Sequence, residues 1–342
     1  MIDLSSDTAT RPTAAMRQCM AEAPVGDEQR REDPSVNALQ ETVAALTGKE
    51  AAVFLPSGTM CNAIALAVQC RRGDAVILHQ HAHPVVAESG GPAVLANVLL
   101  RPVAAERGRF TADQIRPLLD PGDNLASRTS LISVENTSNM GGGAIWQLAR
   151  LAELRALADE HGIALHMDGA RLMNAVVASG QPAAAFAAHV DTVWIDLSKG
   201  LGAPVGAVLA GSAAFIAEAR RFKQMFGGAM RQAGIIAAAG SYALTYHVDR
   251  LAEDHANAEL LEAGLQAIPG IEIVNGPVET NILFFDVAAT GLNAGEFNER
   301  LGEHGVRMGG RGSGSVLRAV THLDVSRDDC ERAVHAVQKA VA

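Results

Sequence analysis

Before about residue 250, short β-branched runs alternate along the chain with longer Ala- and Leu-rich runs. The longer runs, Asn37–Leu46 and Ile145–His161, predict helices, because in the second the leucines recur at helical spacing. Strand and helix alternation of this kind predicts an α/β fold, with a mostly parallel sheet covered by helices on both faces. The predicted strands are Ala51–Leu55, Ala75–Leu78, Thr129–Val134, Ile163–Met167 and Thr192–Leu197, and Val205–Ala210 is expected to add a reversed strand after the turn Gly200–Pro204.

After Arg250 the pattern changes to that of a smaller α+β unit. We therefore expect a large domain at residues 1–248, N-terminal segment included, and a small C-terminal domain at residues 249–342, packed firmly together. The elements expected in the second domain are a charged helix Arg250–Ala267, strands Ile271–Val274, Thr280–Phe285 and Val316–Val320, a helix near Ala294–His304 and a final helix from Arg327.

Composition narrows the class of protein. Apolar residues make up 48% and charged residues 19% of the chain, as in compact globular proteins. The net charge of −10 and the absence of a basic run argue against nucleic-acid binding. The apolar stretches are interrupted by Gly, Pro and Ser or look like buried Ala-rich helices, so we expect no membrane span. No secretory signal is visible, and the 4 cysteines are scattered, which predicts a cytoplasmic protein with reduced thiols unless one long-range bridge forms.

Lys199 follows a predicted strand and precedes a glycine-rich turn, with Leu197 and Leu201 beside it. Burial lowers the pKa of a lysine amine and makes the amine nucleophilic. The alternative for Lys199 taken alone is an amine that extends from the strand end to solvent.

Asp168 ends another predicted strand, within His166-Met167-Asp168-Gly169-Ala170-Arg171. Ligands of open α/β sheets bind at the carboxyl ends of strands. A carboxylate there can pair with the ring nitrogen of pyridoxal 5′-phosphate (PLP), while the alternative is a structural pair of Asp168 with Arg171. A lysine and an aspartate on two such strand ends are together what a PLP site requires.

Two further segments are candidates for ligand contacts. Gly58 and Thr59 lie where a strand gives way to an Ala-rich helix, which suits a phosphate cradle but also an ordinary helix cap. His79, His81 and His83 alternate after the next strand. They lack a cysteine or carboxylate partner at metal-site spacing, so no metal is expected, and an imidazole near the PLP ring fits better.

Motifs along most of the chain, from residue 2 to about 340, resemble the L-threonine aldolases, a family of fold-type-I PLP enzymes. The motifs are Ser6-Asp7-Thr8 with Thr10-Arg11-Pro12-Thr13, Val25-Gly26-Asp27, Glu32-Asp33-Pro34-Ser35-Val36-Asn37, Pro56-Ser57-Gly58-Thr59-Met60, His166-Met167-Asp168-Gly169-Ala170-Arg171, Ser198-Lys199-Gly200-Leu201-Gly202-Ala203-Pro204-Val205-Gly206, Gly227-Gly228 with Met230-Arg231-Gln232, and Val320-Thr321-His322-Leu323-Asp324.

The resemblance implies a large PLP-binding domain and a role for each matching residue. Lys199 matches the lysine that binds PLP covalently, and Asp168 matches the partner of its ring nitrogen. Gly58 and Thr59 match the phosphate loop, and His83 matches the histidine stacked on the ring. The family also implies a homodimer or a dimer of dimers, a homotetramer, with active sites at subunit interfaces.

The resemblance also implies the contacts of an amino-acid substrate. Ser6, Arg171 and Arg318 match groups that hold the substrate carboxylate, and Arg171 is counted with the cofactor contacts as well. Lys223 and Arg231 lie in a loop that resembles one approaching a neighbouring subunit's site.

Three positions depart from the family pattern. Ser138 stands where the family has a histidine near the substrate β-hydroxyl, so we expect Ser138 to line an enlarged or re-polarised pocket and His83 to act as the base. Arg30 and Arg31 replace Tyr-Gly, and either attract an acidic substrate side chain, such as that of β-hydroxyaspartate, or point into solvent. Ser5 replaces an arginine.

The function expected from the resemblance is an aldehyde-lyase that splits a threonine-like β-hydroxy-α-amino acid into glycine and an aldehyde. A β-eliminating lyase or an aminotransferase on the same fold is the alternative. A nucleotide-binding dehydrogenase is disfavoured because no strand is followed by a GxGxxG motif, and Gly309–Gly314 lacks that spacing. A binding protein without catalysis is disfavoured because both Lys199 and Asp168 are present.

Overall fold

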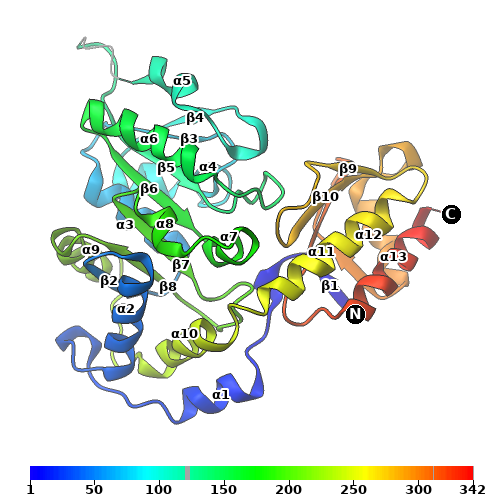
Figure 1. Ribbon diagram of the computed structural model, residues 1–342, viewed down its shortest axis with the longest axis horizontal. Coiled ribbons are helices and arrows are strands. Elements are labelled where there is room, and N and C mark those ends of the chain that lie inside the picture. The colour runs from blue at the N-terminus through cyan, green and yellow to red at the C-terminus, as the bar shows by residue number, and fades with distance from the viewer. Residues whose placement is uncertain (120–123, 311, 342) are drawn as a thin grey trace.

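The computed structural model describes residues 1–119, 124–310 and 312–341. Within these residues a seven-stranded sheet, in the order β2-β8-β7-β6-β5-β3-β4, forms the centre of a larger unit, and a smaller unit lies beside it (Figure 1). The seven strands are β2 (Ala51–Leu55), β3 (Ala75–His79), β4 (Leu99–Val103), β5 (Thr129–Glu135), β6 (Ala164–Gly169), β7 (Thr192–Asp196) and β8 (Ala207–Gly211). Only β8 runs against the others, because it pairs antiparallel with both β7 and β2.

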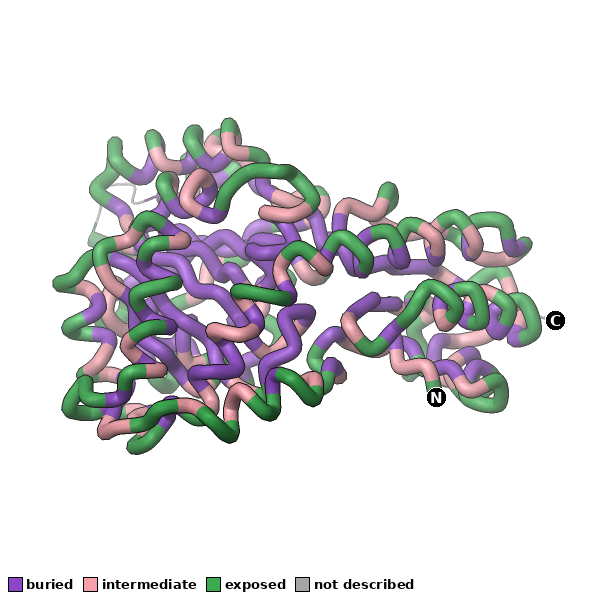
Figure 2. Tube along the Cα trace, turned by 60° about the horizontal axis from the view of Figure 1, so that its bottom comes forward, coloured by how far each residue is buried: buried purple, intermediate pink, exposed green. Residues whose placement is uncertain are grey.

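Alternation along the strands explains why this sheet is covered on both sides. In β2, Ala52 and Phe54 belong to one apolar core, and Val53 and Leu55 belong to another. Successive side chains of a strand point to opposite faces, so a strand that is buried on both faces is mostly apolar. Apart from the edge strand β4, the strands of the larger unit are accordingly buried over most of their length (Figure 2).

Helices supply the two covering layers. One face of the sheet carries α2 (Pro34–Thr47), α6 (Leu148–His161), α7 (Leu172–Ser179), α8 (Ala183–Ala187) and α10 (Gly234–Tyr246), whose apolar side chains share one core. The other face carries α3 (Gly58–Gln69) and α9 (Ala213–Met225). The remaining helical segments of this unit are α1 (Ala14–Ala21), α4 (His83–Val86), α5 (Ala112–Ile115) and the short turns η1 (Asp7–Ala9), η2 (Glu28–Arg30), η3 (Pro92–Ala96), η4 (Glu106–Gly108) and η5 (Arg116–Leu118).

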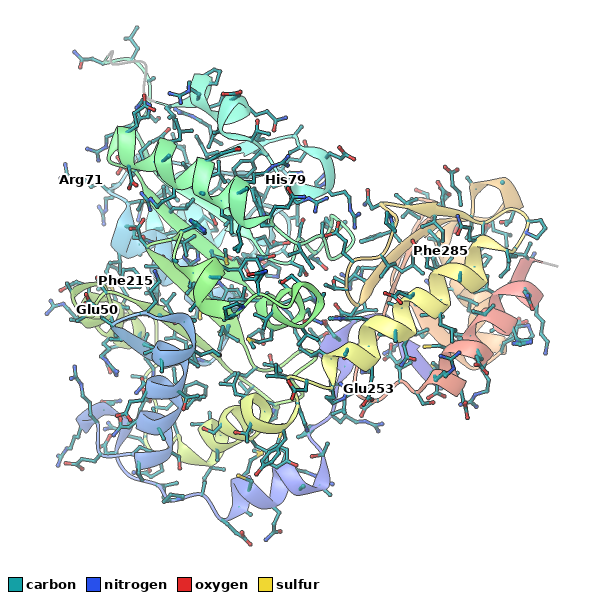
Figure 3. All side chains as sticks on the ribbon, in the orientation of Figure 1. Glu50, Arg71, His79, Phe215, Glu253 and Phe285 are labelled. Atoms are coloured by element: carbon teal, nitrogen blue, oxygen red, sulfur yellow. The ribbon has the colours of Figure 1, made fainter. Side chains whose placement is uncertain are left out.

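The smaller unit has its own core, in which Phe285, labelled in Figure 3, packs with Phe297 and Leu317. Its three-stranded sheet has the order β12-β10-β9, and both pairings are antiparallel. The elements are α11 (Leu251–Gln266), β9 (Glu272–Val274), β10 (Ile282–Asp286), η6 (Ala288–Thr290), α12 (Ala294–Glu303), β11 (Val306–Met308), β12 (Val316–Val320) and α13 (Arg327–Val341).

The N-terminal strand β1 (Ile2–Leu4) pairs in parallel with β11, and Leu4 is buried in the core of the smaller unit. The sequence placed this segment with the larger domain, because three residues carry no pattern that reveals a strand's partner. We propose a division of the chain near residues 248 and 249, with β1 crossing to the smaller unit. Residues 5–13 therefore connect the two units next to the sheet.

The strands expected from the sequence are confirmed, including the reversed β8, and so is the mostly parallel α/β fold. The edge strand β4 was not expected, because its sequence LLRPV is half exposed and contains a proline, and neither feature gives a strand pattern. Helix α2 begins earlier than expected, since Asp33 caps its first turn and Pro34 occupies the first position.

Two further expectations concern thiols and membranes. Cys19, Cys61, Cys70 and Cys330 are all free. Among the described residues, no helix combines the length and the apolar character needed to cross a bilayer.

Candidate active site

A cavity of about 430 Å³ opens at the carboxyl ends of β5, β6 and β7. Segments from both units reach it, including the N-terminal segment and β12. Its lining contains all but one of the site residues expected from the sequence: Ser6, Gly58, Thr59, His83, Asp168, Arg171, Lys199 and Arg318. Residues far apart in the chain are thus brought together where a sheet of this kind binds ligands.

Lys199 lies in the turn after β7, and only 17% of its side chain is exposed. Its Nζ is 3.1 Å from Asp196 Oδ2 and 5.8 Å from the centre of the Trp194 ring. Ser198 donates its amide and its hydroxyl to Asp196 Oδ1, at 2.7 and 2.8 Å. The strand end therefore fixes one carboxylate, and that carboxylate holds the lysine amine at the cavity.

Asp168 ends β6, beside Lys199's strand, and is buried. Its Oδ2 accepts a hydrogen bond from Asn62 Nδ2 at 2.9 Å, and its Oδ1 accepts one from the amide of Ala170 at 3.0 Å. These two donors hold the carboxylate in place at the strand end. The cavity therefore has a fixed carboxylate one strand away from its lysine.

His83 opens α4, and its ring contacts a buried carboxylate. The ring Nδ1 lies 2.8 Å from Glu88 Oε1, and this hydrogen bond raises the pKa of His83. The His83 amide donates to Glu135 Oε2 at 2.9 Å. Glu135 ends β5 next to Asp168, and burial, together with the charge of Asp168, raises the pKa of Glu135. This side of the cavity is therefore rich in carboxylates around one imidazole.

The first turn of α3 borders the cavity with Ser57, Gly58 and Thr59. Ser57 caps the helix by accepting from the amide of Met60 at 3.2 Å. The amides of Gly58 and Thr59 precede the helical hydrogen-bond ladder and point from the positive end of the helix dipole, as in anion sites. Gly58 also packs against Trp194, since a Cβ at this position would lie 2.2 Å from the indole ring.

The Gly58→Ala variant is expected to displace the first turn of α3 or the Trp194 ring, and to cost about 1–3 kcal/mol of unfolding free energy. Chemical denaturation measures this loss. Gly302→Ala is the matched control, because Gly302 lies in α12 and a Cβ there would meet nothing within 4 Å. The control should be neutral or slightly stabilising, and equal losses in both variants would contradict the close packing at Gly58.

Arg171 does not face the cavity as a free cation. Its Nε and Nη2 both donate to the buried Asp7 carboxylate at 2.7 Å. Burial by itself would raise the pKa of Asp7, but the charge and hydrogen bonds of Arg171 hold that pKa well below its usual range. Asp7 thus neutralises most of this guanidinium, while Nη1, which Asp7 does not use, lies in the cavity lining 3.5 Å from Asn139 Oδ1.

The positive charge of Arg318 on β12 is less neutralised by neighbouring carboxylates than that of Arg171. Its Nη1 donates to Asn139 Oδ1 and its Nη2 donates to the carbonyl of Ser5, both at 2.9 Å. Among the described residues no carboxylate lies within ion-pair distance of it. Burial, and then the charge of Arg171, lowers the pKa of Arg318. Ser6 lies nearby in the lining, and its oxygen accepts from the Thr8 amide and hydroxyl, so its own proton can be donated.

The structure does not bring Ser138 to the cavity. Ser138 is buried and pairs through its backbone with Ala144, and its Oγ fits against Gly108 and Gly141, where added Cβ atoms would lie 2.0 and 2.7 Å away. The expectation of a substrate contact at Ser138 is therefore corrected, because the turn after β5 points this side chain into the protein.

Lys223 and Arg231 were expected in a loop near a neighbouring subunit's site, and the structure shows their contacts within this chain. Lys223 is buried in a pair with Glu28, so it does not reach outward. Arg231 is 66% exposed and lies 3.4 Å from Asp27. Arg30 and Arg31 are exposed and do not line the cavity.

The alternating histidines do not converge. His79, labelled in Figure 3, contacts the carbonyl of Ala105 at 3.2 Å through Nε2, and its ring meets that of His81 edge-on. Only His83 of the three lines the cavity. Within the described part of the chain, no three His, Cys, Asp or Glu side chains form a cluster suited to a metal ion.

Sequence reasoning missed several polar residues that organise the site: the buried Asp7, Asn62, Glu88, Glu135 and Asp196, and the partly exposed Asn139. Asp196 and Glu135 carried a usable signal, since each ends a strand on the same sheet edge as Asp168. Asn62 and Glu88 had none, because their partners are known only once the chain is folded.

Comparisons with known proteins agree with this geometry. A family model described as beta-eliminating lyase matches residues 3–290. A low-specificity L-threonine aldolase from Escherichia coli strain K12 is 44% identical over 337 residues, or 98% of each chain. One from Arabidopsis thaliana is 39% identical over 345 residues, covering 99% of this chain and 96% of that one. A solved threonine aldolase structure from Leishmania major superposes with a TM-score of 0.85 at 22% identity, over 100% of both chains.

The chain therefore belongs to the beta-eliminating lyase family. Within that family it belongs with the low-specificity L-threonine aldolases, and it is a lyase. The family expected from the motifs is thus confirmed, and the similarity to the Leishmania structure confirms the fold-type-I architecture.

Proposed function

We propose that the protein is a PLP-dependent aldolase that splits a threonine-like β-hydroxy-α-amino acid into glycine and an aldehyde. The main support is that Lys199 and Asp168 line the same cavity, at the ends of neighbouring strands, in a chain of this family.

The residues of the cavity fit PLP chemically. An amine, a buried carboxylate and the open amides of a helix N-terminus match its aldehyde, ring nitrogen and phosphate respectively. Thr137 also supports a bound ligand in this cavity, because it lines the cavity and its buried hydroxyl has no hydrogen-bond partner among the described residues. PLP attached at Lys199 would supply an electron-accepting ring for cleavage of the Cα–Cβ bond.

The chain's own groups would then orient the substrate. Arg318 binds the substrate carboxylate by charge-assisted hydrogen bonds, and the Ser6 hydroxyl donates to the same group. Arg171, oriented by Asp7, contacts the same carboxylate through Nη1, the nitrogen that Asp7 does not use. Holding the carboxylate at Arg318 and Ser6 would fix the orientation of the substrate about Cα and so select which of its bonds is cleaved.

His83 is the group that moves the proton of the substrate β-hydroxyl. Its Nδ1 is used by Glu88, so Nε2 is the ring nitrogen that can accept a proton. Because the hydrogen bond with Glu88 raises the pKa of His83, the neutral form that can act as a base gains population as the pH rises through neutrality. Aldol cleavage should therefore become faster from mildly acidic to mildly alkaline pH.

Product analysis tests the activity. The protein with PLP is incubated with L-threonine, L-allo-threonine, phenylserine and β-hydroxyaspartate, and glycine and aldehyde are measured separately. Equal amounts of glycine and aldehyde are expected. A keto acid with ammonia would instead indicate a β-eliminating lyase, and a requirement for a keto-acid acceptor would indicate an aminotransferase.

The Arg318→Leu variant is expected to raise the KM for the amino acid by about 10–100-fold, because a charge-assisted contact to the carboxylate is lost. Arg11→Leu, a change on the surface, is the control. An unchanged KM in Arg318→Leu would place the carboxylate elsewhere.

We further propose that the protein is a homo-oligomer, either a dimer or a tetramer, with active sites at the subunit interfaces. We also propose a cytoplasmic location. The oligomer rests on the family resemblance, and the location rests on the scatter of the 4 cysteines. Light scattering of the purified protein measures the oligomer, and a monomer at assay concentrations would contradict it.

A further inference from the structure

Asn62 has more polar contacts at the site than its neighbours on α3, and no part of the proposed reaction uses it. It is buried beneath the cavity. Its Nδ2 donates to Asp168 Oδ2 at 2.9 Å and to Glu88 Oε1 at 2.8 Å. Its Oδ1 lies 2.8 Å from Trp194 Nε1 and 3.3 Å from His166 Nε2. One amide thus contacts two carboxylates, Asp168 in the cavity lining and Glu88, the partner of His83.

The orientation of this amide is fixed by its neighbours. The indole N–H of Trp194 can only donate, so the group facing it must be the Asn62 oxygen. Burial lowers the pKa of His166 to about 3, so this ring is neutral. In the tautomer that carries its proton on Nε2, this ring also donates to the Asn62 oxygen, while Nδ1 faces Thr192 Oγ1 at 2.8 Å. The Asn62 NH₂ group must therefore face the carboxylates.

The two protons of this NH₂ group serve two different anions. One stabilises Asp168, and the other stabilises Glu88, whose Oε1 also contacts His83 Nδ1. Without this donor, both carboxylates would lose one hydrogen bond, and the ring of His83 would face anions that attract a proton more strongly.

We propose that Asn62 is a positioning residue of the active site, which holds Asp168 and Glu88 in place by one hydrogen bond each and, through Glu88, fixes the ring of His83 with Nε2 toward the substrate. The inference rests on the proposed function for the role of Nε2. The arrangement of the network itself rests only on the contacts of Asn62.

The charged groups that face His83 set the direction of the expected effect. Glu88, Asp168 and Glu135 favour a proton on this cluster, and Lys199 opposes it. Removing the Asn62 donor takes away a hydrogen bond that stabilises the anions. The cluster should therefore bind its proton more tightly, and the pH at which His83 loses its proton should rise.

The test replaces Asn62 by leucine, which has a similar size and leaves little room for a water to act as substitute donor. The pKa of His83 is followed by NMR of ring-labelled histidine in the full-length protein, with the signal identified by its loss in His83→Gln. An upward shift of about one pKa unit is expected. Asn174→Leu is the matched control, since Asn174 is equally a buried asparagine, but its side chain contacts His255 outside the cavity.

A second background tests the route through Glu88. In Glu88→Gln the pKa of His83 should fall, because the ring loses its anionic partner, and adding Asn62→Leu should then produce only a small shift. If Asn62→Leu does not fold, Asn62→Ser, which keeps one donor, should give a smaller shift in the same direction. An unchanged His83 titration in a folded Asn62 variant overturns the proposal, and so does a full shift in the Glu88→Gln background.

Catalysis supplies an independent measurement. With PLP and substrate, kcat of Asn62→Leu should fall by about 10–100-fold at little change in KM, because the base is misplaced and substrate contacts are kept. If the protein released no glycine and aldehyde but the His83 titration shifted as expected, the proposed activity would fail and the network would stand. If Asn62→Leu kept normal aldolase kinetics and the pKa of His83 did not shift, the proposed activity would stand and the role of Asn62 would fail.

Discussion

Replacing Lys199 by alanine is expected to abolish glycine release, lowering kcat by on the order of 10³-fold or more, and to remove the visible absorbance of lysine-bound PLP. Lys199 is the amine that lies in the cavity lining, held by Asp196 and close to Trp194. No other lysine lines the cavity within the described part of the chain, so none can substitute for it. Steady-state kinetics and an absorbance spectrum measure the two effects.

Lys339→Ala is the control for this variant, because Lys339 is exposed on α13, far along the chain from the cavity. It should keep both the activity and the absorbance. A Lys199→Ala protein that is folded and retains both properties would contradict the assignment of the amine.

The Asp7→Asn variant is expected to lose about 3–5 kcal/mol of unfolding free energy, because it leaves the buried Arg171 guanidinium without its anion. Asp7 has no exposed surface, and Asn281 also donates to it at 3.2 Å. Denaturant unfolding monitored by circular dichroism measures the loss. Asp324→Asn, which breaks the surface pair with the largely exposed Arg11, should leave the unfolding midpoint nearly unchanged.

The same carboxylate gives a pH dependence with a defined sign. Because the folded-state pKa of Asp7 is held below its unfolded value, its stabilising effect is complete above about pH 4 and is lost as the pH falls further. Wild-type stability should therefore decline below that pH more steeply than the stability of Asp7→Asn. Parallel acid profiles in the two proteins would contradict a depressed pKa at Asp7.

The parts of the fold that the sequence predicted are those that depend on local pattern. Short runs rich in apolar and β-branched residues, such as Ala51–Leu55 and Thr192–Leu197, identified the central strands, because a strand buried on both faces is apolar over most of its length. Strand β4 was not predicted, since its partly exposed position at the edge of the sheet imposes no such pattern. The pairing of β1 with β11 joins opposite ends of the chain and leaves no local signal.

Some residues of the candidate site could likewise be predicted from the sequence, and others could not. Lys199 and Asp168 could be predicted because strand ends of a parallel sheet meet at one edge, and the cavity indeed joins them. The pairing of Arg171 with Asp7 could not, because it depends on how residues 5–13 cross from one unit to the other. Ser138 shows the limit of transferring a role by position, since its side chain points away from the cavity.

The most direct measurement is the position at which PLP is attached. The chain has four lysines, Lys49, Lys199, Lys223 and Lys339, so borohydride reduction of the PLP-loaded protein followed by peptide mass spectrometry distinguishes all of them. A single pyridoxyl group on the peptide that contains Lys199 is expected. A label on another lysine, or none in a folded protein with PLP added, would contradict the account.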